Sequence, residues 1–176
     1  MQVDWERRVP VGCFVALADV TRVQIPMPTV DPWDYFSVKD GFYALKWEIA
    51  ITVQPPYECV WVNGPYRGAK SDITIFNRHR LTHVLEPGEM VMADKGYVGS
   101  SKCGTPFKGY LQNLNADQRR INKKNRRIRQ AIERFNKRLK DFDCLSGTWK
   151  YGANLCELVV MVACQILNFT FHDEPL

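Results

Sequence analysis

The feature that most constrains the fold of this chain is a basic, amphipathic stretch at residues 117–140. It contains eleven Lys or Arg and two acids, so it carries +9, whereas the rest of the 176-residue chain carries −4. Its apolar residues recur at the spacing of one face of an α-helix. That face is formed by Ile121, Ile128, Ile132, Phe135, Leu139 and Phe142. The pattern predicts a long helix that packs this face against the rest of the fold.

The opposite side of the predicted helix is cationic, with one carboxylate in its middle. Glu133 lies one helical turn from both Arg129 and Lys137, and Arg126 and Lys140 flank that pair. One interpretation is a solvated basic helix with an ordinary Arg–Glu pair, which contributes about 0.3–0.5 kcal/mol. The other is a surface that binds a polyanion such as nucleic acid, with a carboxylate that acts on it. The choice depends on whether other carboxylates converge on Glu133.

Composition and cysteine usage favour a single intracellular domain spanning residues 1–176. The chain is long enough for one sizeable core, and its aromatic content argues against disorder. Six scattered cysteines without a C-x-x-C pair indicate reduced thiols, not a disulfide framework or a zinc ribbon. No apolar leader is present, and the apolar run 155–171 contains Glu157, Gln165 and Asn168. We therefore expect a buried final helix over residues 151–171 and no membrane contact.

The first half of the chain has the composition of strands. An apolar run at 13–18 ends on Asp19, and the runs 42–54 and 57–62 follow with no helix between them, which suggests an antiparallel meander. Ser71 and Asp72 suit the N-cap and first turn of a short helix. A strand at 90–93 then ends on Asp94, and residues 100–116 are predicted to form a loop or a short subdomain.

Two histidines in this region have the spacing of a metal site. His79 and His83 stand four residues apart, but no third ligand is evident near them in the sequence. We expect a surface pair of histidines here.

Asp19 and Asp94 each follow an apolar strand. A lone aspartate in such a place often caps a turn. If the two strands are parallel neighbours, however, both carboxylates emerge at one edge of the sheet, and Glu133 can join them from the basic helix. Three converging carboxylates repel one another unless a hard divalent cation such as Mg²⁺ or Mn²⁺ lies among them. Two such ions can cleave a phosphodiester bond, while the Arg and Lys residues hold the DNA backbone.

Several segments resemble the ordered motifs of one family. Residues 18–21 (ADVT) resemble V-D-G-T, and residues 68–76 (GAKSDITIF) resemble G-S-x-x-D-x-x-x-F. Residues 93–97 (ADKGY) match A-D-x-G-Y, and Arg129, Glu133 and Lys140 match R-x3-E-x6-K. Near the end, Asn168 and Phe169 resemble the last two residues of H-N-F. With these motifs the chain resembles the catalytic domain of DDE-type transposases, most closely the PIF/Harbinger-like group and related bacterial insertion-sequence enzymes.

The resemblance implies an α/β fold, an RNase H-like mixed sheet flanked by helices. It implies a DNA endonuclease that uses two Mg²⁺ or Mn²⁺ ions, held by Asp19, Asp94 and Glu133, to hydrolyse phosphodiester bonds and carry out strand transfer. The residues expected to contact DNA are Arg126, Arg129, Lys137 and Lys140, with orientation of Glu133 as a second possible role for Arg129 and Lys140. Asp72 is expected first as a structural acid and second as a supporting residue near the metals.

A second function is compatible with the same resemblance. The helix-turn-helix region that such enzymes carry before this domain has no counterpart in the sequence, so recognition of a DNA target would need another chain. A catalytically silent, domesticated or truncated relative would keep the fold and only bind nucleic acid or a protein. DNA is the expected partner, with a separate DNA-binding protein and a homo-oligomer as further candidates. The expected location is intracellular, and nuclear in a eukaryote.

Overall fold

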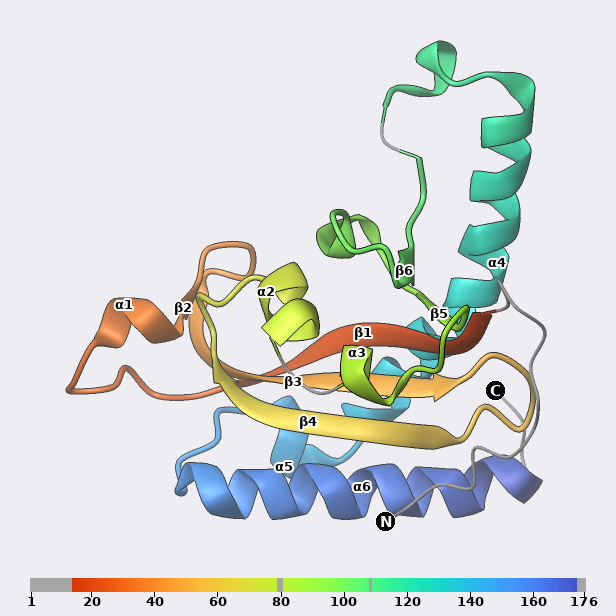
Figure 1. Cartoon of the computed structure of the whole chain (residues 1–176). Helices are drawn as coiled ribbons and strands as arrows, with labels where there is room; N and C mark the ends of the chain where they lie inside the picture. The colour runs from red at the N-terminus through yellow and green to blue at the C-terminus, as the bar shows by residue number, and fades with distance from the viewer. Residues whose placement is uncertain (1–13, 79–80, 108, 174–176) are drawn as a thin grey trace.

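A computed structural model describes residues 14–78, 81–107 and 109–173. Its centre is a six-stranded mixed sheet (Figure 1). The strands are β1 (Phe14–Gln24), β2 (Phe36–Ser37), β3 (Phe42–Thr52), β4 (Cys59–Arg67), β5 (Met90–Met92) and β6 (Cys103–Gly104). β1, β3 and β4 form the expected antiparallel meander, whereas β5 pairs parallel to β1 and β6 pairs parallel to β5. The predicted RNase H-like α/β fold is confirmed by this mixed sheet and its flanking helices.

Helices cover both faces of the sheet (Figure 1). They are α1 (Pro32–Tyr35), α2 (Asp72–Arg78), α3 (Leu81–Val84), α4 (Ala116–Leu139), α5 (Asp143–Ser146) and α6 (Ala153–Asp173). Two short 3-10 helices, η1 (Lys95–Tyr97) and η2 (Leu111–Asn113), lie in the connections after β5 and β6. The segment 100–116, expected to be a loop or a short subdomain, is a connection that contains a short strand and a 3-10 turn.

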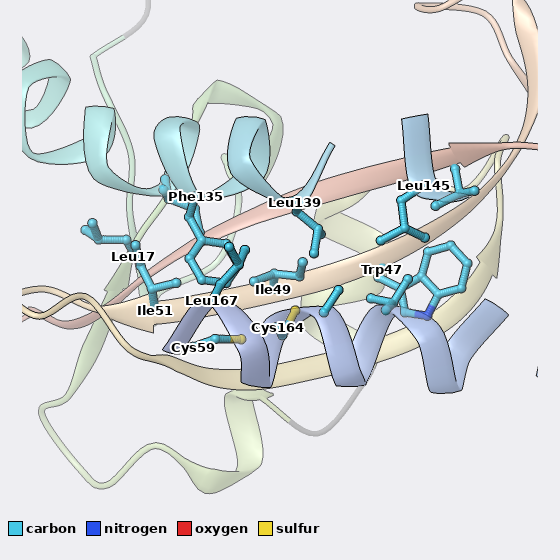
Figure 2. Packing of buried hydrophobic residues seen from close by; sticks show 14 of the residues in the cluster. Leu17, Trp47, Ile49, Ile51, Cys59, Phe135, Leu139, Leu145, Cys164 and Leu167 are labelled. Atoms are coloured by element: carbon cyan, nitrogen blue, oxygen red, sulfur yellow. The ribbon is translucent and has the colours of Figure 1, made fainter. Parts of the chain in front are cut away.

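The alternation of side chains along β1 and β3 divides the core into two clusters. Leu17, Ile49 and Ile51 face α4 and α6, where Phe135 and Leu167 pack against them (Figure 2). The intervening small residues of the same strands face α2, α3 and η1 on the other side. Because both faces are buried, the central strands are fixed in register, and any polar group on them has a defined direction.

Helix α4 forms as expected, but only its second half packs on the sheet. Asn115 and Gln118 close its start with a capping box, in which each side chain accepts from the other residue's backbone N–H. Ile132 and Phe135 are fully buried, whereas Ile121 is 41% exposed because the first turns of the helix extend beyond the sheet (Figure 1). The prediction that the whole apolar face is buried was therefore wrong for its N-terminal end.

The final helix, α6, differs from the expectation of a buried helix. Cys156, Val160 and Cys164 are buried against the sheet, but Leu158 and Phe169 are 59% and 75% exposed on the outer side. One face of α6 is enough to close the core, so the other apolar face stays on the surface. By length and composition alone, Ala153–Phe171 also has the properties of a membrane-spanning helix, with 33% of its most apolar window buried in the fold.

Candidate active site

Asp19 lies on β1, and Asp94 lies just after the end of the neighbouring parallel strand β5. Leu17 of β1 is paired with Met92 of β5, so each aspartate follows one member of this pair by two residues. The charge of Asp94 raises the pKa of Asp19, so the two carboxylates lie near each other. The condition set by the sequence, that these strands be parallel neighbours, is met.

The local position of Asp19 differs from the expectation. β1 does not end at Asp19 but continues to Gln24, because β3 pairs with it along this whole length. On its other edge, β1 is paired with β5 only as far as Leu17. Asp19 therefore lies inside a long strand, at the point where the neighbouring strand has already turned away. The pairing with β3 on both sides of Asp19 fixes its backbone in the sheet.

Burial raises the pKa of Asp19 to about 6. A hydrogen bond from the backbone of Val20 lowers this pKa, the charge of Asp94 raises it, and the charge of Arg129 lowers it. The amide Nδ2 of Asn136, from α4, donates to Oδ2 of Asp19 at 2.9 Å. Asp19 is thus a desolvated carboxylate that a second carboxylate repels, and a nearby cation relieves part of this cost.

Asp94 is fixed by the turn that follows β5. Its side chain caps η1, where Oδ1 accepts a hydrogen bond from the backbone N–H of Gly96 at 2.6 Å. A Cβ atom on Gly96 would stand 2.9 Å from this Oδ1 and 3.3 Å from Oδ2 of Asp72. Glycine at this position therefore lets the backbone lie against two carboxylates at once.

Asp72 approaches this turn from the start of α2. Its carboxylate pairs with the Lys46 ammonium at 3.4 Å and with the Arg22 guanidinium at 3.8 Å. Asp72 therefore has the contacts of a structural acid that neutralises two partly buried cations. It also lies close enough to Asp19 to raise the pKa of that carboxyl, so it borders the two strand aspartates.

Glu133 forms an ion pair with Arg129, its neighbour on α4. Its Oε1 lies 3.4 Å from the guanidinium of Arg129, and 53% of its side chain is exposed. Arg129 is only 17% exposed, and its charge also acts on Asp19. The guanidinium of Arg129 therefore links the helix carboxylate electrostatically to the strand carboxylate.

The four basic residues expected at the DNA differ in their surroundings. Arg126 and Lys137 are exposed on α4. The ammonium of Lys140, in contrast, donates to the backbone carbonyls of Arg22 and Leu145, which ties the end of α4 to β1 and α5. Burial lowers the pKa of Lys140 to about 8. These are the contacts of a residue that orients the helix, which is one of the two roles expected for it.

The side chains that could hold a divalent cation at this site are the carboxylates of Asp19, Asp94 and Glu133. Within the described part of the chain, no group of three or more His, Cys, Asp and Glu side chains is close enough to hold a metal ion. Mg²⁺, however, is commonly bound by one or two carboxylates together with substrate phosphates and water. Asp19 and Asp94 are two such carboxylates, whereas Glu133 is paired with Arg129 in this structure. His79 of the histidine pair lies outside the described residues.

Asn136 belongs to the site although the sequence did not predict it. Asn136 contacts Asp19, and its Oδ1 is buried without a hydrogen-bond partner among the described residues. It follows Glu133 by three positions, so Arg129, Glu133, Asn136 and Lys140 share one side of α4. Helical spacing from Arg129 and Glu133 was the available signal, but an asparagine in a basic helix carries no chemical signature of its own.

Comparison with known proteins identifies the family of the chain. The sequence model of the DDE superfamily endonucleases matches residues 18–168. A probable transposase for insertion sequence element IS702 from Microchaete diplosiphon is 29% identical over 150 residues, which cover 81% of this chain and 52% of that protein. The chain thus spans about half the length of this relative. No solved structure matches the chain. Because the family match includes both strand aspartates, α4 and most of α6, the chain belongs to the DDE superfamily endonucleases.

Proposed function

We propose that this chain is the catalytic domain of a divalent-metal-dependent DNA endonuclease that hydrolyses phosphodiester bonds, with strand transfer as a second reaction at the same site. The observation that carries the proposal is the parallel pairing of Leu17 with Met92, two residues before Asp19 and Asp94, together with the charge of Asp94 that acts on Asp19. The motifs at 93–97 and 129–140 support a place near the PIF/Harbinger-like group.

In this proposal, the carboxylates of Asp19 and Asp94 hold Mg²⁺ or Mn²⁺ together with a phosphate of the DNA. The bound ions supply an activated water or 3′-hydroxyl and stabilise the leaving oxygen. Asn136 fixes Oδ2 of Asp19, and the Gly96 N–H fixes Oδ1 of Asp94, so both ligands are oriented before substrate arrives.

Glu133 is the third carboxylate of the proposed site. Its Arg129 partner is a bidentate phosphate ligand by chemistry, and a DNA phosphate competes with Glu133 for the guanidinium. When Arg129 turns to the phosphate, Glu133 is released toward the aspartates. We infer that substrate binding completes the acidic triad, and that this exchange couples the presence of DNA to the assembly of the metal site.

The exposed part of α4 is the proposed DNA surface. Arg126 and Lys137 are exposed on the same helix that carries Glu133. Their position suits contacts to phosphates on either side of the cut. DNA is therefore the proposed substrate, with a separate DNA-binding chain and a second copy as candidate partners. The proposed location is the compartment that holds DNA, which is the nucleus in a eukaryote.

A second candidate function is binding without cleavage. The observation that favours it is the ion pair of Glu133 with Arg129, which keeps the third acid away from the other two. A silent relative would retain the basic helix and bind DNA in a salt-dependent way.

Nicking of supercoiled plasmid DNA separates the two functions. We expect nicking with Mg²⁺ or Mn²⁺, loss of nicking in Asp94→Ala and Glu133→Gln, and unchanged nicking in Asp141→Asn, which alters an exposed acid after α4. Absence of nicking by the wild type, or equal nicking by Asp94→Ala, contradicts the endonuclease proposal. Salt-sensitive binding without any nicking supports the silent alternative.

A further inference from the structure

A depression of about 510 Å³ lies beside the candidate active site. Its walls come from α1 and the segment after it, from the link between β4 and α2, and from η1. Gly96 lines the depression, and its backbone N–H donates to Oδ1 of Asp94. The depression is therefore one hydrogen bond away from Asp94, and its size is in the range of small-ligand sites.

The lining of this depression is cationic. It includes Arg22, Lys39, Lys46 and Lys70, and its one acid is Asp72. Arg22 and Lys46 are engaged by carboxylates, since Arg22 pairs with Asp40 at 2.9 Å and Lys46 with Asp72 at 3.4 Å. Lys39 is exposed, and the Lys70 ammonium lies over the Tyr66 ring at 5.4 Å. The excess positive charge at the rim suits an anionic ligand.

An aromatic ring stands at the outer lip. Trp33 of α1 is 73% exposed and packs edge-on against Phe36, with ring centroids 5.8 Å apart and an interplanar angle of 77°. Phe36 is braced in turn by Tyr43. α1 is held in place by Arg67, whose guanidinium pairs with Asp31 and Asp34. The Trp33 ring is therefore held in position and has an accessible face. Burial of this large side chain would have stabilised the fold, yet the ring is exposed.

A positive rim, an accessible indole and an adjacent phosphodiester-cleaving site point to one ligand class. We propose that this depression binds an unpaired nucleotide next to the cut, with its base stacked on Trp33 and its phosphate near Lys39 and Lys70. This inference rests on the proposed function. Stacking on an aromatic side chain tolerates any base, so the pocket selects for a single-stranded state and not for a sequence. It therefore gives the enzyme a preference for DNA that is frayed or already nicked beside the scissile phosphate.

The test compares two DNA probes, a short blunt duplex and the same duplex with a single-stranded 3′ overhang whose first unpaired base is 2-aminopurine. We expect the wild type to bind the overhang at least about fivefold more tightly than the blunt duplex and to quench the 2-aminopurine fluorescence. Trp33→Ala should lose both effects and keep its affinity for the blunt duplex, whereas Trp33→Phe should retain most of the preference.

Tyr151→Ala is the matched control. Tyr151 is also exposed, at 71%, and also packs edge-on against a neighbouring ring, that of Trp149, but it lies in the link before α6. It should behave as the wild type. Equal binding of both probes by a wild type that nicks plasmid, or an intact preference in Trp33→Ala, overturns the nucleotide pocket alone. A wild type that binds neither probe and does not nick contradicts the proposed function as well.

Discussion

At the scale of single residues, the acids of this protein owe their properties to the element that carries each of them. Asp19 is set inside a strand and is desolvated, Asp94 is fixed by the backbone of a turn, and Glu133 stands on a helix where it is half exposed and paired. The first two are held by backbone and side-chain hydrogen bonds, whereas the contact of the third is an ion pair on its own helix. If DNA releases Glu133 from Arg129 as proposed, the complete site forms only in the presence of DNA.

Asn136 is predicted to act as a positioning residue for Asp19. Asn136→Ala removes the hydrogen bond that another side chain donates to Oδ2 of Asp19, so the carboxylate should be less well oriented. We expect nicking to fall about 10- to 100-fold and half-maximal nicking to require more Mn²⁺, as is usual when a partner of a metal ligand is lost. Asn122→Ala is the control, because the hydrogen bonds of that amide within the described residues are to the backbone of Phe107. An unchanged Mn²⁺ requirement in Asn136→Ala would refute the positioning role.

Glu48 is predicted to make the stability of the fold depend on pH. Burial raises its pKa to about 8, a hydrogen bond from Trp61 lowers it, and the charge of Asp72 raises it. The folded chain therefore holds this proton more tightly than the unfolded chain, and the free energy of unfolding should fall as pH rises from about 4.5 to about 8, by at most about 1.4 kcal/mol per pH unit.

Glu48→Gln keeps the shape of the side chain and removes its titration. Urea unfolding of both proteins at several pH values checks the prediction. The variant should gain stability relative to the wild type as pH rises through this window, with no further gain above about pH 8. A constant difference between the two proteins across the window would show that Glu48 does not titrate there.

At the scale of elements, α4 has two functions in two halves. Its second half closes the core, and its exposed basic side is the surface proposed to bind DNA. Ile132→Ala should therefore destabilise the fold by about 2–5 kcal/mol, because it leaves a cavity in the core. Ile121→Ala, at the projecting end of the same helix, should cost less than about 1 kcal/mol. Chemical denaturation of both variants measures this, and equal losses would contradict the division of the helix.

The exposed cations of α4 are predicted to set the salt dependence of DNA binding. Arg126→Ala and Lys137→Ala should each lower the slope of log affinity against log salt by about one, since each contact displaces condensed counterions from DNA. Lys150→Ala, which removes an exposed cation in the link before α6, should leave the slope unchanged. Fluorescence anisotropy over a salt series gives the slopes. If Arg126→Ala and Lys137→Ala keep the slope of the wild type, as Lys150→Ala should, DNA binds elsewhere on the molecule.

At the scale of the whole molecule, the sequence carries the architecture better than the details of the site. The periodicity of residues 117–140 suffices to predict α4, and the apolar runs before Asp19 and Asp94 suffice to predict strands there. The mixed RNase H-like sheet was expected from the resemblance of the motifs to a family. The projection of Ile121 and the exposed face of α6 were not predictable in this way. Both depend on how far the sheet extends beneath a helix, which is a property of the tertiary fold.

The local contacts of the site were less accessible still. Motif spacing singled out Arg129 and Glu133 but left open whether they form an ion pair, because a paired glutamate and one that is free to bind a metal have the same place on the helix. Neither the amide of Asn136 on Asp19 nor the depression beside Gly96 has a sequence signature, since each is formed by segments far apart in the chain. These features follow from the register of β1 and β5 and from the docking of α4 and α2 around it.

The central claim is that a divalent cation binds between the strand aspartates Asp19 and Asp94. Cleavage of the polypeptide by Fe²⁺ with ascorbate and peroxide, in the presence of a DNA duplex, tests this most directly, because hydroxyl radicals cut the backbone close to the bound iron. We expect fragments that end near residues 19 and 94. Excess Mg²⁺ should suppress them, and they should be absent in a variant that carries both Asp19→Asn and Asp94→Asn. Cuts confined to other acidic segments, such as residues 141–143, or cuts that persist in that variant, would contradict it.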